Sequence, residues 1–266
     1  MFDACVPLRM WFGFSEDYRQ IIINARQELV LLRANTNINS IITGGDDAHE
    51  PKITITRIVW RMPHILVSDV ERLKLLQYVQ HDLEIPLKFR CWDLYTYPAL
   101  PQTNRHIWNV SNIPQEEAPR NVIMGFQTDR RANEKKDSSK FDPLTLRNIK
   151  VFLNSQMYPY DELQLDYTKN LFLPLDEMYA NFQHSYYGKQ KGPALTPNEF
   201  KSIAPLAVID CSKQNEGLNL GGVDIRIEFE TADNIPANTS AYALLIHDKS
   251  VSYNALSGGV NTATLI

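Results

Sequence analysis

The sequence has little cysteine, and its histidines are scattered. The only thiols are Cys5, Cys91 and Cys211, which are widely spaced and include no CxxC pair. An odd count with such spacing argues against a disulfide framework and against a zinc site, so Cys91 and Cys211 are expected to be small buried side chains. The six histidines show neither HxH nor HExxH spacing. We therefore expect no metal-binding residues.

Motifs of catalysis are also missing. The chain contains no GxSxG, no GxGxxG and no phosphate-binding loop. Asp210 stands next to Cys211, and a neighbouring carboxylate raises the pKa of a thiol, which is the wrong direction for a nucleophile. His247 and Asp248 form a lone pair near a predicted strand end, a pattern typical of a turn. The sequence predicts no enzyme activity, no catalytic residues and no cofactor.

Positive charge and long apolar runs are scarce. The formal net charge is −4, whereas a nucleic-acid-binding surface needs a basic patch, so no direct contact with nucleic acid is expected. No apolar run approaches the about 18–20 residues of a membrane-spanning helix. The first ten residues lack the basic region and apolar core of a signal peptide. We expect a soluble intracellular protein made in a reducing compartment.

Strand patterns fill most of the chain. Hydrophobic residues make up 44% and charged residues 22%, which is enough apolar material for a globular core. Alternation and β-branched residues are clearest in residues 52–61, KITITRIVWR. Pro159 breaks the strand 147–154, because proline cannot donate to a ladder. The predicted strands are 2–8, 20–34, 52–61, 86–97, 105–112, 120–129, 147–154, 205–211, 223–231, 239–247 and 250–254.

Three helices interrupt these strands. From Leu175 to Tyr186, apolar residues recur at three- and four-residue steps, which predicts one apolar helix face over 174–187. Pro174 and Gly188 stand where such a helix begins and ends. Ser68, followed three residues later by Glu71, predicts the start of a short helix. Another short helix is expected near Thr196.

Many short runs resemble one known family. VFLNSQMYPYDELQLDY is followed by DEMYANFQHSYYG, APLAVIDCSKQNE and VDIRIEFE. Upstream, MFDACVPLRMWFGFSEDYR, IVWRMPHILVSD and MGFQTDRR continue the likeness. Together they resemble the double jelly-roll major capsid proteins of Polinton (Maverick) type elements and related viruses. The resemblance covers nearly the whole chain and rests on many matches in the same order.

The strand count suggests how the chain is divided. Four strands, a helix and four more strands predict an all-β chain with one complete eight-stranded jelly-roll sandwich in residues 83–266, its helix lying between the fourth and fifth strands. Residues 67–82 would be a connector helix. Residues 1–66 would hold only the later strands of a first jelly roll. The resembled family has two complete rolls, so this chain would be a truncated copy, a partial gene model or a cropped chain.

The resemblance implies a structural role. The family forms homotrimers in which six rolls make a pseudo-hexagonal capsomer of a capsid lattice, with penton or minor capsid proteins as further partners. The protein would then lie in a virion if the element is active. An alternative is a jelly-roll module that binds carbohydrates or receptors. A third interpretation, a cupin-like metal enzyme, would need converging histidine and acidic residues.

Aromatic residues in predicted loops are the candidate site residues. Tyr, Phe and Trp number 12, 11 and 4. Aromatic side chains in loops anchor protein interfaces, because they bury large areas at little entropic cost. They could equally plug the open ends of a barrel. The candidates are Trp11, Phe12, Phe14, Tyr158, Tyr160, Tyr186 and Tyr187.

Overall fold

The chain forms two compact units. The computed structural model describes residues 3–42, 52–114, 118–189, 192–214 and 222–262. Thr36–Pro51 and Trp92–His247 form what we call the sandwich unit. Met1–Asn35, Lys52–Cys91 and Asp248–Ile266 form the terminal unit. These boundaries differ from the predicted division at residues 66 and 82.

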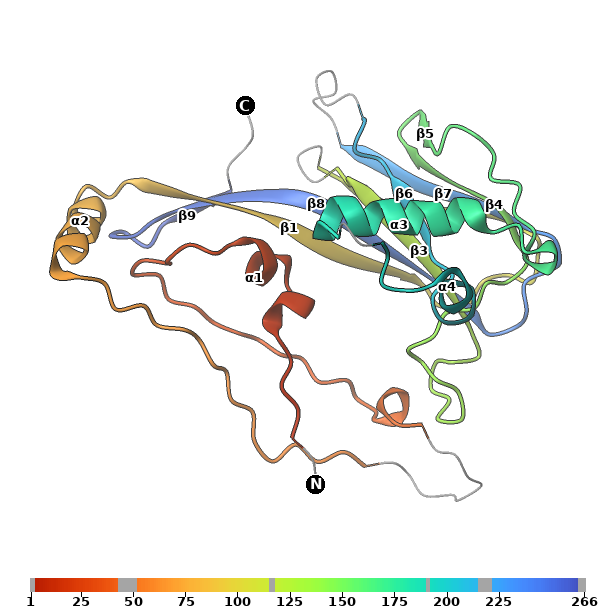
Figure 1. The fold of residues 1–266 in the computed structure, drawn as a ribbon, viewed down its shortest axis with the longest axis horizontal. Coiled ribbons are helices and arrows are strands. Elements are labelled where there is room, and N and C mark those ends of the chain that lie inside the picture. Colours follow the sequence, from red (N-terminus) through yellow and green to blue (C-terminus); the bar gives the residue numbers. More distant parts are fainter. Residues whose placement is uncertain (1–2, 43–51, 115–117, 190–191, 215–221, 263–266) are drawn as a thin grey trace. The chain divides into compact units, whose positions relative to one another are not determined.

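Two antiparallel sheets make the sandwich. One sheet has the order β1-β8-β3-β6, with β9 also paired to β8, and the other has the order β2-β7-β4-β5 (Figure 1). Strands that follow one another in the sequence mostly lie in different sheets, which is the jelly-roll arrangement of two Greek keys. The strands are β1 (Glu84–Tyr97), β2 (Arg105–Ile113), β3 (Asn121–Thr128), β4 (Leu146–Leu153), β5 (Gln156–Tyr158), β6 (Ala207–Asp210), β7 (Val223–Thr231), β8 (Thr239–Asn254) and β9 (Val260–Thr262).

The predicted jelly-roll class is confirmed, but its strand assignment needs three corrections. Two short strands were not predicted, namely β9 and β5, a three-residue strand that ends at the cis Tyr158–Pro159 bond. The third correction is that residues 239–247 and 250–254 were predicted as separate strands, whereas β8 runs through His247 and Asp248 without a turn. The omission of β5 and the division of β8 cancel in the count β1–β8. The long helix therefore follows the fifth strand, and its predicted place between the fourth and fifth strands was wrong.

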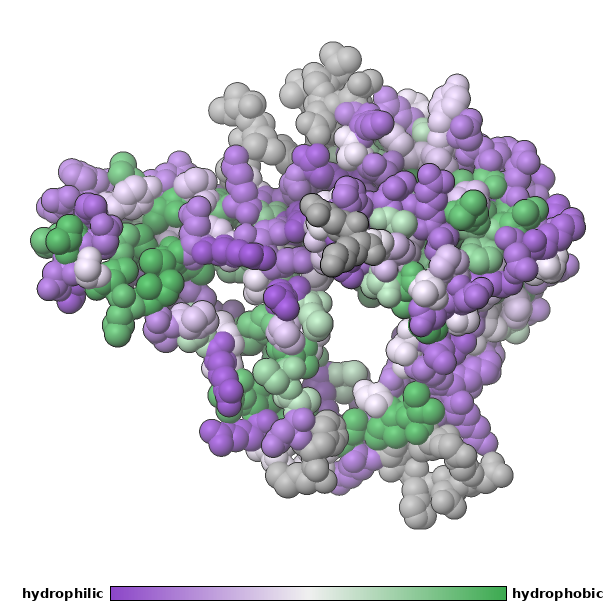
Figure 2. Space-filling model, in the orientation of Figure 1, coloured by the Kyte–Doolittle hydropathy of each residue, from purple (hydrophilic) through white to green (hydrophobic). Residues whose placement is uncertain are grey.

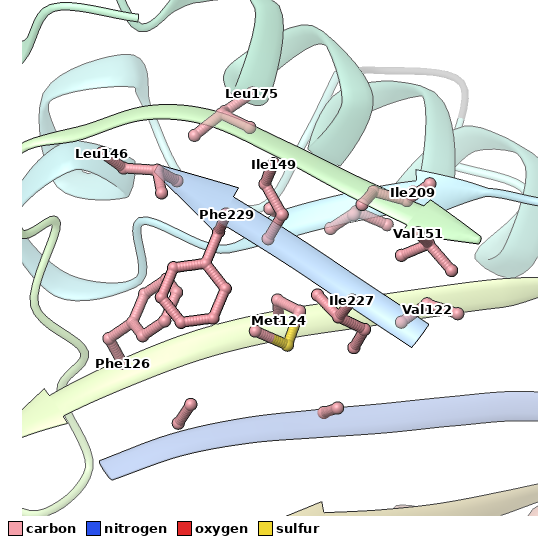
Figure 3. Packing of buried hydrophobic residues seen from close by; sticks show 14 of the residues in the cluster. Val122, Met124, Phe126, Leu146, Ile149, Val151, Leu175, Ile209, Ile227 and Phe229 are labelled. Atoms are coloured by element: carbon pink, nitrogen blue, oxygen red, sulfur yellow. The ribbon is translucent and has the colours of Figure 1, made fainter. Parts of the chain in front are cut away.

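The core lies between the two sheets. Along β7 the side chains alternate, with Val223, Ile225, Ile227 and Phe229 buried and the residues between them at least partly exposed. Figure 3 shows Ile227 and Phe229 packed with buried side chains of β3 and β4. Each fully buried Ile or Phe contributes about 1.5–3 kcal/mol of hydrophobic stabilisation. The alternation of apolar and polar residues along the strand thus produces an apolar layer between the two sheets.

Two helices cover the sandwich unit. The prediction of α3 (Leu173–Tyr187) is confirmed, and Gly188 ends it in a left-handed conformation with φ 64°. The helix contacts β6 (Figure 1). Its buried Phe182 belongs to the core. The predicted second helix is α4 (Pro197–Ile203), which begins with a capping box between Thr196 and Glu199.

Gly125 allows a close approach on the outer face of β3. A Cβ atom at this residue would lie 2.6 Å from the ring of Phe141 and 2.7 Å from a methyl group of Leu206. The side chains of Phe141 and Leu206 therefore occupy the space that the Cβ atom of any other residue at position 125 would need. The loop that contains Phe141 is also held by Asp142, which binds Arg130 through both carboxylate oxygens at 2.6 and 3.0 Å.

The terminal unit is built differently, and three strand predictions in it were wrong. Residues 18–35 and 52–68 form no strand. The predicted strand 2–8 ends in a 3-10 helix, η1 (Leu8–Met10), and the predicted loop after it contains α1 (Gly13–Asp17). Within residues 3–42 and 52–66 the partial first roll is therefore not formed as a sheet.

The alternation in residues 52–61 has a flaw that explains this result. Ile53 and Ile55 occupy odd positions, but Ile58 and Trp60 occupy even ones. A regular strand would place the two pairs on opposite faces, so neither face would be uniformly apolar. Such a strand needs apolar cover on both sides, and the terminal unit leaves Ile55 and Ile58 50% and 66% exposed.

The helix predicted to start after Ser68 is present as α2 (Asp69–Gln80), and it lies within the terminal unit. Ser68 Oγ accepts a hydrogen bond from the backbone N–H of Glu71 at 3.4 Å, as the cap predicted. The Glu71 carboxylate binds Lys74 at 2.8 Å. None of the residues of α2 is fully buried. Val70, Leu73 and Leu76 are exposed, whereas Val79 packs against the small cluster around Ile85.

Candidate assembly surfaces

The terminal unit carries an exposed segment that contains both basic and apolar residues. We call residues 52–66 the basic segment, because they contain Lys52, Arg57 and Arg61, all exposed, and no acidic residue. Their apolar side chains are exposed as well, with Leu66 at 99% and Ile58 at 66%. The apolar side chains continue through α2, where Figure 2 shows hydrophobic surface.

An acidic and apolar segment lies in the sandwich unit. We call residues 160–173 the acidic segment. Tyr160 is 81% exposed and Leu173 67% exposed, and the side chains of Asp161 and Glu162 face solvent beside Tyr160 in sequence. Glu162 has one weak ion pair, with Lys150 at 3.9 Å. This segment combines exposed apolar side chains with negative charge, whereas the basic segment combines them with positive charge.

Asp166 in the acidic segment serves the local fold. Its carboxylate accepts hydrogen bonds from the hydroxyl of Thr168 at 2.6 Å and from the backbone N–H of Thr168 at 3.0 Å. Hydrogen bonds from Thr168 and Lys169 hold the pKa of Asp166 well below its usual range. Asp161 and Glu162 are therefore the better candidates for contacts with another molecule.

A tight contact fixes α1 to β1 within the terminal unit. Gly13 lies so close to β1 that a Cβ atom would be 1.8 Å from the carbonyl oxygen of Arg90. Asp17 accepts hydrogen bonds from the backbone N–H and from Nε of Arg90, both at 2.8 Å. The hydrogen bond from the Arg90 side chain lowers the pKa of Asp17. Phe14 packs edge-on against Phe89, with ring centroids 5.1 Å apart.

The seven candidate aromatic residues are divided between the two units. Three of them are only partly exposed: Phe14 packs against Phe89, while Tyr158 and Tyr186 border the core of the sandwich unit. The Tyr186 hydroxyl also accepts a hydrogen bond from Trp92 Nε1 at 2.8 Å. The other four are exposed and stay candidates for an interface; they are Trp11, Phe12, Tyr160 and Tyr187.

His247 is not in a turn, contrary to the prediction. It lies within β8, is 2% exposed, and its Nε2 is 2.8 Å from Oδ2 of Asp93 on β1. Asp93 was not predicted as the partner of His247, because no local sequence pattern links residues 154 positions apart. Within the described ranges, no group of three or more His, Cys, Asp and Glu side chains is placed to hold a metal ion.

The thiols follow the expectation only in part. Cys211 is buried, and this burial raises the pKa of its thiol. The negative charge of the nearby Asp210 raises the pKa further. Cys91 is only half-buried and Cys5 is exposed.

Among the residues that the structure describes, no helix is long and apolar enough to span a lipid bilayer.

A shallow polar depression lies on the second sheet. Asn109 and Ser111 line it from β2, beside a register shift. Its other lining residues are Asp224, Ile225 and Arg226 of β7 and Asn154, which lies in the turn after β4. Arg226 stacks on the ring of Phe152 at 4.5 Å and binds Glu228 at 3.0 Å. The depression has carboxamides, but neither Trp nor Tyr lines it.

These features define a protein of the jelly-roll β-sandwich class. A model of the family described as double jelly roll-like domain matches residues 1–251. The chain belongs to this family. No curated protein matches the chain.

Several solved structures are similar at low identity. The chain is 11% identical to a chain of the Sputnik virophage solved by cryo-EM, covering 69% of this chain and 40% of that one, with a TM-score of 0.42. PBCV-1 VP54, fitted into a reconstruction of Sputnik, is 9% identical over 74% of this chain and 55% of that one, with a TM-score of 0.43. A chain of the PBCV-1 virus capsid is 8% identical with the same coverage and a TM-score of 0.42. The chain thus spans about half the length of these solved chains.

Proposed function

We propose that this protein is a structural subunit of a capsid-type shell, and that it acts by self-association. Its membership of the double jelly roll-like domain family over residues 1–251 is the observation that carries the proposal. The jelly-roll strand order of the sandwich unit agrees with it. In such a role the sandwich is a rigid building block, and the loops and exposed segments make the contacts.

The distribution of apolar surface supports self-association. Monomeric proteins rarely expose contiguous apolar patches of more than a few hundred Å². Leu66, Leu32 and Ile58 of the terminal unit are 99%, 93% and 66% exposed. Side chains this exposed gain hydrophobic stabilisation only when another surface covers them. A subunit that meets its neighbours through these residues would bury them.

The assembly that we expect is a homotrimer, in which jelly rolls make a pseudo-hexagonal capsomer within a lattice. Penton or minor capsid proteins would be further partners, and the virion would be the location. Light scattering of the purified full chain at tens of micromolar tests this proposal. A trimer mass is the expected result. A monomer that shows no association at any concentration up to that range would contradict it.

A binding module is the second candidate, and the polar depression on the second sheet favours it. Asn109, Asn154 and Arg226 offer hydrogen-bond groups suited to a hydroxyl-rich ligand such as a glycan. The absence of Trp and Tyr from its lining speaks against a strong sugar-stacking site. A glycan-binding screen, repeated with Arg226→Ala, tests this candidate. Binding that is lost in the variant, by a chain that stays monomeric, would favour the module over the shell subunit.

A further inference from the structure

The basic segment and the helix α2 that follows it together present an apolar area of the size that a stable interface needs. From Ile55 to Leu76, nine large apolar side chains are 40–99% exposed. A fully buried Val, Leu or Ile side chain removes roughly 60–120 Å² of apolar surface from water, so these nine side chains together present on the order of 500 Å². Stable protein–protein interfaces bury about 800 Å² on each partner, of which somewhat more than half, roughly 450 Å², is apolar. This stretch alone is therefore large enough to form one side of a specific contact.

The charge of the basic segment restricts which surface meets it. A contact between two copies of the same segment would bring Lys52, Arg57 and Arg61 of one copy against the same residues of the other. Like charges at an interface oppose association. The charge pattern thus disfavours a two-fold contact of this segment with itself and favours a second, acidic surface.

The acidic segment has the complementary character. Asp161 and Glu162 supply exposed negative charge, and Tyr160 and Leu173, 81% and 67% exposed, supply apolar surface next to it. Lys169 is the cation of this segment and forms an ion pair with Asp166 at 3.1 Å, so Asp161 and Glu162 leave the acidic segment with a net negative charge. Each of the two segments therefore offers apolar side chains with a net charge, positive in one and negative in the other. Complementary potentials steer encounter and fix the register of an interface.

We propose that the basic segment of one copy binds the acidic segment of a second copy. This inference rests on the self-association described under the proposed function and specifies its contact. When the two segments of one copy meet two different neighbours the contact is heterologous, and such contacts close into rings when the rotation between neighbours allows it. A trimeric ring joined by three such contacts is the arrangement that agrees with the homotrimer proposed above.

Charge exchange tests the contact. The double variant Arg57→Glu/Arg61→Glu is expected to weaken self-association about tenfold or more, since it places four acidic groups together. Asp161→Lys/Glu162→Lys is expected to do the same from the other side. Combining all four substitutions restores opposite charges and is expected to recover most of the lost association. Sedimentation velocity over a dilution series measures each effect.

Lys88→Glu/Lys213→Glu is the matched control, because both lysines are exposed, lie outside the two segments and give the same change in net charge. This control should associate like the wild type. Far-UV circular dichroism should be unchanged in all variants. Raised salt is expected to weaken the wild-type contact, because exposed charges are screened within about 8 Å at physiological ionic strength.

The outcomes separate this inference from the proposed function. Self-association that persists unchanged in both charge-reversal variants overturns the contact and leaves the shell subunit standing. A wild-type chain that never associates overturns both. Co-sedimentation with vesicles of phosphatidylserine and phosphatidylcholine, by a chain that stays monomeric, would assign the basic segment to a lipid surface and also overturn the contact. Weakening in each double variant with recovery in the combined variant supports it.

Discussion

Similar apolar residues are buried in the sandwich unit but exposed in the terminal unit. In the sandwich unit, Ile227 and Ile225 are 0% and 1% exposed, because each strand has paired neighbours and a facing sheet. In the terminal unit, Ile58 and Ile65 are 66% and 64% exposed in a backbone that forms no ladder. The apolar residues are of the same kind, but only one unit provides a second layer to cover them.

This difference indicates that the sandwich unit provides most of the stability and that the terminal unit provides apolar surface for association. Burial of apolar side chains between two sheets stabilises the sandwich unit without a partner. The terminal unit has one small buried cluster of its own, Ile85 with Tyr253 and Ala255, and the tight contact of α1 with β1. Its remaining apolar surface gains stability only through association. Substitutions in the two units should therefore affect different measurements.

The largest expected effect comes from the core. Phe182 is 7% exposed on α3, and Phe182→Ala is expected to lower the free energy of unfolding by about 3–5 kcal/mol, since the truncation leaves a cavity. Leu66→Ala, at a side chain 99% exposed, is expected to change it by less than about 0.5 kcal/mol. Denaturant titration measures both. Equal losses in the two variants would remove the distinction between the units.

An ion pair gives the next largest effect. Asp142 binds Arg130 and accepts a hydrogen bond from the backbone N–H of Thr128 at 2.8 Å. Burial alone would raise the pKa of Asp142, but the hydrogen bonds from Arg130 and Thr128 prevail, so the pKa is lowered. Asp142→Asn is expected to cost about 1–3 kcal/mol at neutral pH, because hydrogen bonds to a charged group are lost.

The pH dependence of that loss follows from the direction of the shift. A carboxyl group whose pKa is lower in the folded state adds stability above its unfolded pKa of about 3.9, and this stability is lost as the pH falls through the folded value. The difference between wild type and Asp142→Asn should thus shrink between about pH 4 and pH 2. Glu177→Gln, at an exposed position of α3, is the control and should match the wild type throughout. A difference that stays constant down to pH 2 would refute the role of the ion pair.

A smaller, local effect is expected in the terminal unit. Gly13→Ala introduces a Cβ atom that would clash with the Arg90 carbonyl oxygen, so α1 should detach from β1. Global unfolding of the sandwich unit should hardly change, since α1 lies outside it. Hydrogen exchange is expected to show faster exchange in residues 14–18 alone. Faster exchange in β3 and β7 as well would mean that the two units unfold together.

The sequence predicted the sandwich unit far better than the terminal unit, for physical reasons. Strands such as β7 combine strict alternation with a paired neighbour on each side, so local pattern and tertiary structure agree. The run 52–61 has strand-forming residues, but its apolar positions change parity between Ile55 and Ile58. Strand propensity describes a fit to a half-buried sheet surface, and here no such surface is present.

The candidate site was predicted only in outline. In the structure, Tyr160 and Tyr187 are exposed, whereas Tyr158 and Tyr186 are partly buried beside the core. No sequence pattern distinguishes the exposed pair from the partly buried one. The opposite charges of the two segments were readable from the sequence, but their importance depends on which apolar residues remain uncovered. Asp93 could not be linked to His247 from sequence alone, because their contact depends on the pairing of β1 with β8.

The most direct test of the account is hydrogen exchange of the full chain as a function of protein concentration. We expect amides of residues 52–66 and 160–162 to exchange quickly in dilute solution and to become protected as the chain associates, whereas amides such as that of Leu165, which donates to the Arg147 carbonyl oxygen at 2.8 Å, are protected within one copy. Amides of β3 and β7, which form ladders on both sides within one copy, should be protected equally at every concentration. Protection of residues 52–66 that is already complete in a dilute monomer, or that never changes with concentration, would contradict the claim that this segment is an interface between copies.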